Sequence, residues 1–364
     1  MASNKLLVLG FSVSALFFSP LGFLAVVQTP LFFVFHQQSD IIYLLLYVDD
    51  IIITSNDSSL LDSFARKLNY EFATKDLGSL SYFLGLEATS TTDGLFISQL
   101  KYARDILTRA QLLDSKPIHT PMIVSQHLTS DGPAFSDPTL YRSLVGVLQY
   151  LTITRPNIAH VVNSVSQFLH APTADHFLAV KRILRYVKDT LHFGLTFLPS
   201  AAPGALVVYF DADWAGCPDT CRSTFGYFIY LGDNLVSWSA KKQPTISHSS
   251  CESEYRALAT TATELLWLTH LLHDLKSPFH QSLFSCVTTK VADLFTKSVS
   301  RPLFDFFHTK LHLERTWPVA DVHQRKVEMT HSLFSSSPGA LLKCQGVNAK
   351  GLLKAAPGKE EPQS

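Results

Sequence analysis

The sequence predicts an α+β fold with two folded parts and a disordered C-terminal tail. Short runs rich in β-branched and aromatic residues occur beside longer segments whose apolar residues have helical spacing. The proline and small-residue stretch LPSAAPG at 198–204 separates the two parts. From Glu314 onward the chain is rich in Lys, Gly, Ser and Pro and has no periodicity, which predicts an irregular tail over 314–364.

The composition excludes some classes of protein. Hydrophobic residues make up 46% of the 364 residues and charged residues 16%, against roughly 25% charged in soluble domains, so the chain as a whole is not intrinsically disordered. Thirty Lys and Arg balance thirty Asp and Glu, which excludes a strongly basic nucleic-acid-binding tail but not a polymerase. The five Cys form no C-x-x-C pair. This favours a reducing compartment, and we expect the chain in the cytoplasm or the nucleus.

Residues 1–35 leave two interpretations open. Lys5 and the following LLVLGFSVSALFFSPLGFLAVV have the order of a signal peptide or anchor, which would make the chain secreted or membrane-bound. Pro20 and Pro30 interrupt the run, and no clear small-residue cleavage motif follows. A buried helix followed by a buried strand has the same composition. We favour this second interpretation and expect no membrane partner.

The first part opens with a hairpin of two apolar strands, 41–48 (IIYLLLYV) and 51–54 (IIIT), joined by Asp49-Asp50. Their β-branched and aromatic residues predict that both strands are buried. The pattern then predicts a helix at 58–70, strands at 77–87 and 94–99, a helix at 99–113, a connector at 114–138, and helices at 139–170 and 174–190.

The second part has strands first and a long helix after them. The pattern predicts strands at 205–210, 225–231 and 234–239, and a helix from Ser250 to about Leu275. The Gly232-Asp233-Asn234 turn closes the pair formed by the second and third of these strands. After Cys286 the pattern becomes fragmentary.

Asp49 and Asp50 form the first candidate site, at the tip of the apolar hairpin. Adjacent carboxylates repel each other and lose solvation there, so a bound cation would compensate, and hard oxygen ligands favour Mg²⁺. Asp is also a common turn residue, so an Asp-Asp turn that faces water explains the same pattern. The spacing alone leaves both interpretations open.

Asp211 and Glu254 form the second candidate site. VVYFDADWAG puts Asp211 at the end of a buried strand, and Asp213 shares its face. SSCESEYRALA puts Glu252 and Glu254 early on a helix, where only one of them can face inward, and the spacing favours Glu254. The alternative is a solvated strand end and a first-turn acid that stabilises the helix dipole.

Two groups of cations are candidate contacts for nucleic acid. One lies along a predicted helix at spacings that share a face, and the other follows the third strand of the second part; they are Lys181, Arg182, Arg185 and Lys188, and Lys241 and Lys242. Phosphate-backbone contact is one interpretation. A solvated helix face is the other.

The chain resembles the reverse transcriptases of Ty1/copia-type retrotransposons from about Phe11 to Leu198. The motifs that carry the resemblance are YLLLYVDDIIIT, DLGSLSYFLGLE, ISQLKYARDIL and YRSLVGVLQYLTITRPNIAHVVNSVSQFLHAPTADHFLAVKRILRYVKDT. The resemblance implies that residues 1–198 form a partial reverse transcriptase, with the late palm and the thumb or connection region. It also implies that Asp49 and Asp50 are Mg²⁺ ligands and catalytic residues.

The stretch from DADWAG to ELLWLTHLL resembles the ribonuclease H domain that follows reverse transcriptase in the same family. By this resemblance Asp211 and Glu254 are the first two metal-binding catalytic carboxylates, and Asp213 and Glu252 are weaker substitutes. The resemblance implies a degenerate ribonuclease H-like domain over 205–313. Its middle segment, with a strand that ends in Asp-Asn and the last carboxylate, is missing between Cys286 and Val287. Asp293 lies in VADLFTK, which resembles the family's own tail motif, so we do not assign it as a replacement ligand.

These resemblances imply a truncated and internally deleted retrotransposon Pol product. Its parent chemistry is Mg²⁺-dependent DNA synthesis and hydrolysis of RNA in RNA–DNA hybrids. The family also has a metal-binding Asp on an earlier palm strand, before the point where this chain starts. Because required carboxylates of both sites are missing, we expect a catalytically dead chain. RNA–DNA hybrid is the expected partner and no small-molecule cofactor is expected. A non-catalytic nucleic-acid-binding protein is the alternative.

Overall fold

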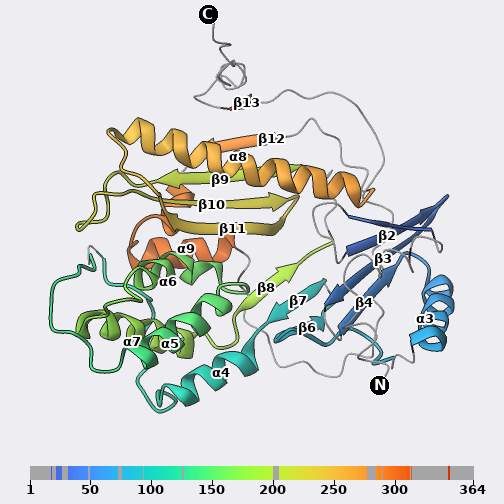
Figure 1. Ribbon diagram of the computed structural model, residues 1–364, viewed down its shortest axis with the longest axis horizontal. Helices are drawn as coiled ribbons and strands as arrows, with labels where there is room; N and C mark the ends of the chain where they lie inside the picture. Colours follow the sequence, from blue (N-terminus) through green and yellow to red (C-terminus); the bar gives the residue numbers. More distant parts are fainter. Residues whose placement is uncertain are drawn as a thin grey trace, which may run out of the picture.

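In the part of the chain that the computed structural model describes, the strands form three sheets (Figure 1). The structure describes residues 18, 22–26, 32–47, 50–72, 76–92, 94–124, 127–199, 205–276, 284–288, 290–311, 313 and 343–344. The predicted tail over 314–364 therefore lies outside the described residues, apart from 343–344. The mixture of helices and sheets agrees with the predicted α+β class.

The first sheet is antiparallel and holds the predicted apolar hairpin. Its strands in spatial order are β1 (Phe23–Ala25), β2 (Phe32–Gln37), β3 (Asp40–Tyr47) and β4 (Asp50–Ser55). Alternate residues of β3, Ile42, Leu44 and Leu46, are buried, as the period of two in a strand requires. Helix α3 (Ser58–Phe72) buries Phe64 and Leu68 in the same core. The two strands of the hairpin and the helix at 58–70 are confirmed, but the expectation that both strands are buried is wrong for β4, whose residues are half-buried or exposed.

The second sheet joins segments that are far apart in the sequence. Its order is β5 (Tyr82–Phe83), β6 (Leu86–Ser90), β7 (Leu95–Ser98) and β8 (Gly194–Phe197). The single strand predicted over 77–87 is wrong, because Leu84 and Gly85 have φ values of 51° and 79° and turn the chain between β5 and β6. Gly194 is required where β8 meets β7, since a Cβ there would lie 2.3 Å from the carbonyl oxygen of Ile97.

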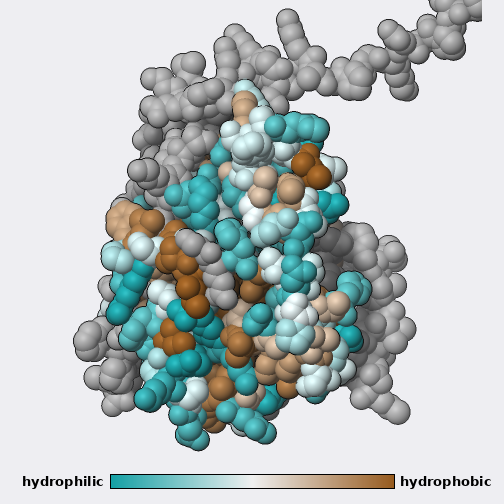
Figure 2. Space-filling model, turned by 90° about the vertical axis from the view of Figure 1, so that its left-hand side faces the viewer, coloured by the Kyte–Doolittle hydropathy of each residue, from teal (hydrophilic) through white to brown (hydrophobic). Residues whose placement is uncertain are grey.

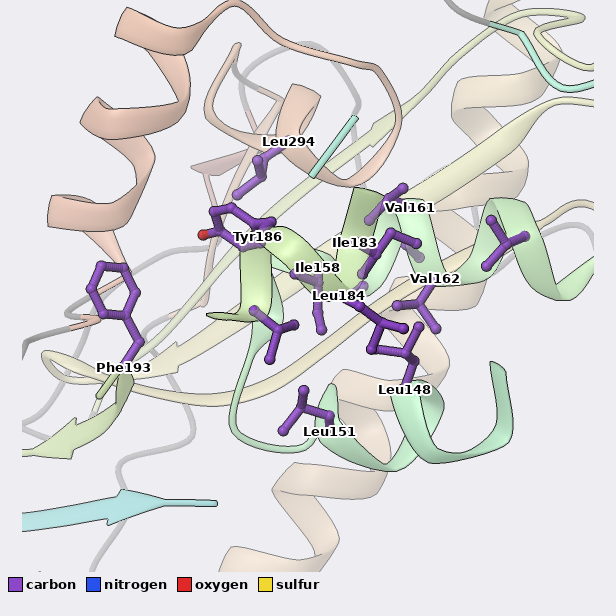
Figure 3. Packing of buried hydrophobic residues seen from close by; sticks show 14 of the residues in the cluster. Leu148, Leu151, Ile158, Val161, Val162, Ile183, Leu184, Tyr186, Phe193 and Leu294 are labelled. Carbon is purple, nitrogen blue, oxygen red and sulfur yellow. The ribbon is translucent and has the colours of Figure 1, made fainter. Parts of the chain in front are cut away.

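In the described part of the chain, four α-helices lie between β7 and β8 in sequence. They are α4 (Leu100–Arg109), α5 (Pro138–Leu151), α6 (Ala159–Ser166) and α7 (Ala174–Asp189). The helix predicted over 139–170 is divided, because the short 3₁₀ helix η2 (Pro156–Ile158) starts at a proline, which lacks the N–H needed to continue α5. Figure 3 shows Leu148, Val162 and Leu184 meeting in the shared core.

Buried Arg155 fixes the end of α7 to this core. Its guanidinium donates to Thr190 Oγ1 at 3.1 Å, to the Thr190 carbonyl, and to the Leu191 carbonyl at 3.0 Å. It also lies over the ring of Phe193, 5.5 Å from the centroid. These contacts satisfy carbonyls at the helix C-terminus that have no partner within the helix.

The third sheet has the order β11-β10-β9-β12-β13. These strands are β9 (Leu206–Ala212), β10 (Thr224–Leu231), β11 (Asn234–Lys242), β12 (Phe284–Thr288) and β13 (Lys343–Cys344). The first three are antiparallel neighbours, whereas β12 runs parallel to β9. Strand β12 continues across the Cys286–Val287 junction, since Cys286 pairs with Val208 and Val287 with Tyr209.

Helical elements cover both faces of the third sheet. Helix α8 (Ser250–Asp274) lies along one face, where alternate residues Leu206, Val208 and Phe210 of β9 are buried against it (Figure 1). The 3₁₀ helix η3 (Lys290–Phe295), together with α6 and α9 (Arg301–Lys310), lies on the opposite face. The even-numbered side chains of β9 thus face α8, and the odd-numbered ones face η3 and α6.

Several long-range hydrogen bonds connect the parts of the molecule, among them those from Ser130 to Asp219 Oδ2 and those made by Trp238 and Tyr43. Trp238 Nε1 on β11 donates to the Thr152 carbonyl after α5 at 3.1 Å. The Tyr43 hydroxyl on β3 donates to the Leu275 carbonyl at the end of α8 at 3.0 Å. On the side where β9 ends and α8 begins, apolar residues lie in small groups among hydrophilic ones (Figure 2).

Candidate functional site: carboxylates at the end of β9

Asp211 is the last outward-facing residue before β9 ends. Because Phe210 and Ala212 are buried on the α8 side, Asp211 points to the opposite face, toward the segment after η3. Its Oδ2 accepts a hydrogen bond from the Thr296 hydroxyl and lies 3.5 Å from Lys297 Nζ. Only 16% of the Asp211 side chain is exposed, so the carboxylate is held among protein groups.

Glu254 reaches the same strand end from the first turns of α8. Ser249 caps this helix by accepting a hydrogen bond from the Glu252 amide at 3.1 Å. Glu254 Oε1 accepts from the Ala212 amide at 3.4 Å. Its Oε2 atom is buried, and no group among the described residues donates a hydrogen bond to it. Burial, and then the charge of Asp211, raise the pKa of Glu254 to about 7.

Glu252 lies outside this cluster, as the prediction of a single inward-facing acid requires. It accepts from the His248 amide at 2.7 Å and pairs with Arg256 at 2.6 Å. These contacts stabilise the beginning of α8. Glu252 is therefore a capping residue and not a substitute for Glu254.

Asp213 stabilises the loop between β9 and β10 by accepting hydrogen bonds from backbone amides. Its Oδ1 accepts from the Thr224 amide, and the Gly216 amide also donates to its carboxylate. A Cβ at Gly216 would lie 2.0 Å from Asp213 Oδ2, so the loop closes on the carboxylate only with glycine there. Burial raises the pKa of Asp213 to about 6; the charge of Asp211 raises it too, and the two amides and Lys297 oppose this shift.

The structure brings Asp293 to the site, which the sequence reasoning did not predict. Lys297 Nζ lies 3.0 Å from Asp293 Oδ1 and 3.5 Å from Asp211 Oδ2, so one ammonium bridges both carboxylates. Burial lowers the pKa of Lys297, but the hydrogen bond to Asp293 and the charge of Asp211 outweigh it, so the net shift is upward. The sequence signal for this arrangement is the Asp293–Lys297 spacing of one helical turn.

Close packing of η3 on β10 sets the position of Asp293, Thr296 and Lys297. Phe295 is fully buried, and a Cβ at Gly226 would lie 2.2 Å from its Cβ. Ala292 and Leu294 are buried in the same core. The backbone around the bridging lysine is thus fixed by apolar contacts and not by the ion pairs alone.

The donor chemistry of the cluster suits Mg²⁺, but its arrangement does not. Carboxylate oxygens are the ligands that this ion prefers, and buried Glu254 Oε2 has no donor among the described groups. Within the part of the chain that the structure describes, however, no three Asp, Glu, His or Cys side chains gather as a metal site. The Lys297 ammonium lies between Asp211 and Asp293 instead.

The other predicted pair, Asp49 and Asp50, is only partly described. Asp49 lies outside the described residues. Asp50 is exposed at the start of β4, opposite Tyr47 in the register of the hairpin. The Tyr47 ring meets the edge of Phe83, with centroids 6.5 Å apart, so the hairpin tip lies beside β5.

Three of the four predicted cations on α7 hold the connector that precedes α5. Arg182 donates to Thr120 Oγ1 at 2.9 Å, Arg185 to the Lys116 carbonyl at 2.7 Å, and Lys188 to the Ser115 carbonyl. The fourth, Lys181, lies over the Phe177 ring at 4.7 Å. The four cations of α7 therefore make contacts within the chain, and those of the first three stabilise the packing of the connector on this helix.

The two cations on β11 differ from each other. Lys242 Nζ contacts Cys217 Sγ at 2.8 Å. Lys241 is exposed. Lys241 is therefore the more accessible of the pair to an external phosphate.

Among the described residues, no helix combines the length and the apolar character needed to cross a membrane. Of residues 1–35, proposed above as a possible signal or anchor, only 18, 22–26 and 32–35 are described. Phe23 and Phe33 in these stretches belong to the core of the first sheet.

Comparison with known proteins gives one family match. Residues 20–124 match the family model described as "Reverse transcriptase (RNA-dependent DNA polymerase)". The chain is 48% identical to an uncharacterized mitochondrial protein of Arabidopsis thaliana over 225 residues, which cover 62% of this chain and 93% of that protein.

Two further relatives carry transposon names. The retrovirus-related Pol polyprotein from transposon RE1 of Arabidopsis thaliana is 45% identical over 256 residues, which cover 70% of this chain but 17% of that polyprotein. A putative transposon Ty5-1 protein of Saccharomyces cerevisiae is 32% identical over 228 residues, covering 62% of this chain and 74% of that protein. No solved structure matches the chain.

Proposed function

This chain belongs to the Pol family of copia-type retrotransposons, and from that membership we propose that it is a catalytically inactive remnant of a reverse transcriptase joined to a ribonuclease H. Residues 1–198 are the partial reverse transcriptase, with the late palm and the thumb or connection region. Residues 205–313 are a degenerate ribonuclease H-like domain without its middle segment, and 314–364 are an irregular tail. The intact parent would act on RNA–DNA hybrids in the cytoplasm or nucleus.

One observation carries the proposal for the second part. Asp211 at the end of β9 and Glu254 on α8 converge on one strand end, where burial, and then the charge of Asp211, raise the pKa of Glu254. Strand β12, the neighbour of β9, has the sequence FSCVT and contributes no carboxylate. A ribonuclease H-like reaction needs ions held in place by converging acids, and the Lys297 bridge uses two of the acids that are present.

When bound, Mg²⁺ would supply charge stabilisation and an activated water for the parent reaction. Asp211 and Glu254 are the residues of this chain that we propose as remaining ligands of the second site, and Asp49 and Asp50 as those of the first. In this arrangement the pKa of Glu254 is raised to about 7, and Asp211 is paired with Thr296 and Lys297. We therefore derive no catalytic step.

Two experiments test this function. Primer extension on an RNA template with Mg²⁺ tests the first part: we expect no incorporation, and incorporation that Asp50→Asn abolishes would contradict the proposal. Sequencing the transcript across the codons of Cys286 and Val287 tests the missing segment. We expect the two codons to be adjacent; an in-frame segment that encodes an Asp-Asn strand would contradict the deletion.

A further inference from the structure

Lys297 follows η3 and lies beside two carboxylates at the end of β9, although it is not one of the proposed metal ligands. Its ammonium lies 3.0 Å from Asp293 Oδ1 and 3.5 Å from Asp211 Oδ2. The neighbouring Thr296 hydroxyl donates to the same oxygen of Asp211. Two consecutive side chains of one segment thus bind the acid at the end of β9.

The ion pairs alone do not explain this position. Half of the Lys297 side chain is exposed, and a solvent-exposed pair contributes little because water screens it. The segment is placed by Phe295, which packs directly on Gly226, and by buried Ala292 and Leu294. Packing therefore delivers the ammonium to the carboxylates, and little side-chain entropy is lost in forming the bridge.

The cluster has more acids than cations. Asp211 and Asp293 both contact the Lys297 ammonium, and Asp213 and Glu254 lie close enough to Asp211 for the charges of these acids to interact. Buried Glu254 Oε2 has no described donor. Carboxylate oxygens are the ligands that divalent cations prefer, but an ion bound by Asp211 and Asp293 would have to displace the ammonium that lies beside both.

We propose that Lys297 is an internal counter-cation that competes with divalent metal ions for Asp211 and Asp293. The inference rests on the proposed function in that it concerns the same cluster. Lys297 is not assigned as a catalytic residue; it acts through the two acids that it bridges. Its removal exposes both carboxylates and removes a like charge from the position that a metal ion would approach.

The test is Mn²⁺ binding to the full chain without nucleic acid, measured from the electron paramagnetic resonance signal of free Mn²⁺. We expect Lys297→Met to bind Mn²⁺ at least about tenfold more tightly than wild type, since a positive charge next to the ion is lost. Lys297→Arg keeps the charge and should remain close to wild type. Lys67→Met removes an exposed lysine from α3 and is the matched control.

The gain must also depend on the acids. Adding Asp211→Asn to Lys297→Met should return the affinity to the wild-type level. Equal Mn²⁺ affinity of wild type and Lys297→Met would overturn the inference, provided that both have the same circular dichroism spectrum. If Lys297→Met does not fold, the Mn²⁺ affinity of Lys297→Gln is compared with that of wild type instead, and equal affinities would again overturn the inference.

These results are separate from those that test the function. Hydrolysis of an RNA–DNA hybrid by the wild-type chain would contradict the proposal that the chain is inactive. It would not affect the comparison of Mn²⁺ affinities, which tests the role of Lys297. Equal Mn²⁺ affinity of wild type and Lys297→Met would contradict the role proposed for Lys297, but not the proposal that the chain is inactive.

Discussion

Phe295 lies directly over Gly226 on β10, so closely that a Cβ at position 226 would be 2.2 Å from the Phe295 Cβ. This contact brings η3 onto the face of the third sheet where Asp211 points. The chemistry at the end of β9 thus depends on a glycine near the start of the neighbouring strand, opposite Asp211 in the register.

Gly226→Ala should destabilise the fold. The added methyl group must displace Phe295, and overpacking of a close-packed core costs about 1–3 kcal/mol. A lower urea midpoint by circular dichroism checks this. Gly146→Ala on α5 is the matched control, because nothing lies within 4 Å of its Cβ position and an exposed helical Gly→Ala change stabilises by about 0.5–1 kcal/mol. Equal effects of the two variants would contradict the close contact.

Arg155→Met should be among the more damaging substitutions in the helical part. Arg155 is 2% exposed, and its loss leaves the carbonyls of Thr190 and Leu191 without their donors, at a cost of about 1–3 kcal/mol for each buried group. Arg142→Met removes a single exposed contact with the Leu169 carbonyl and should change the thermal midpoint little. A small shift for Arg155→Met would show that water replaces the guanidinium.

The stability of the wild-type chain should fall through Glu254 between pH 4.5 and about pH 7. Its pKa is raised from 4.5 to about 7 in the fold, so between these values the folded chain holds a proton that the unfolded chain has released. The stabilisation by protonated Glu254 is complete below the unfolded pKa and is lost as the pH rises through the folded pKa.

Glu254→Gln keeps the uncharged form at all pH values. The difference between its urea midpoints at the two ends of this pH range should therefore be smaller than in wild type. Glu252→Gln is the control, because the pKa of Glu252 is lowered by its bond to the His248 amide and by Arg256, and it stays ionised across the range. An unchanged pH dependence in Glu254→Gln would contradict the burial of this carboxyl.

The basic residues should divide into two groups when RNA–DNA hybrid binding is measured against salt. The exposed side chain of Lys241 makes no contact with a described residue that its replacement would break. Lys241→Met should therefore lower the slope of binding affinity against salt concentration by about one ion. Arg185→Met breaks the bond to the Lys116 carbonyl and should increase proteolysis within 114–138 more than it weakens binding. The reverse assignment would show that α7 is the nucleic-acid-binding face.

The sequence was sufficient for elements whose pattern is local. The β-branched and aromatic residues of IIYLLLYV predicted a buried strand, and β3 buries Ile42, Leu44 and Leu46. The helix from Ser250 to about Leu275 was also predicted, and α8 spans Ser250–Asp274. In both cases the side chains that define the pattern lie close together along the chain.

The sequence was insufficient where tertiary contacts or unusual backbone angles decide. A turn at Leu84 was not predictable from residue preference, because leucine rarely adopts its φ of 51°. The sequence could not place Asp293 at the site, because the contact between Lys297 and Asp211 depends on how η3 packs on β10. Local spacing showed the Asp293–Lys297 pair but not its neighbour across the sheet.

The central claim is that the carboxylates at the end of β9 no longer support hydrolysis. The most direct measurement is the cleavage of the RNA strand of an RNA–DNA hybrid by the purified full chain, with Mg²⁺ and then with Mn²⁺, beside Asp211→Asn and Glu254→Gln. We predict that wild type and both variants give the same rate as buffer. Metal-dependent cleavage by wild type that Asp211→Asn abolishes would contradict the claim.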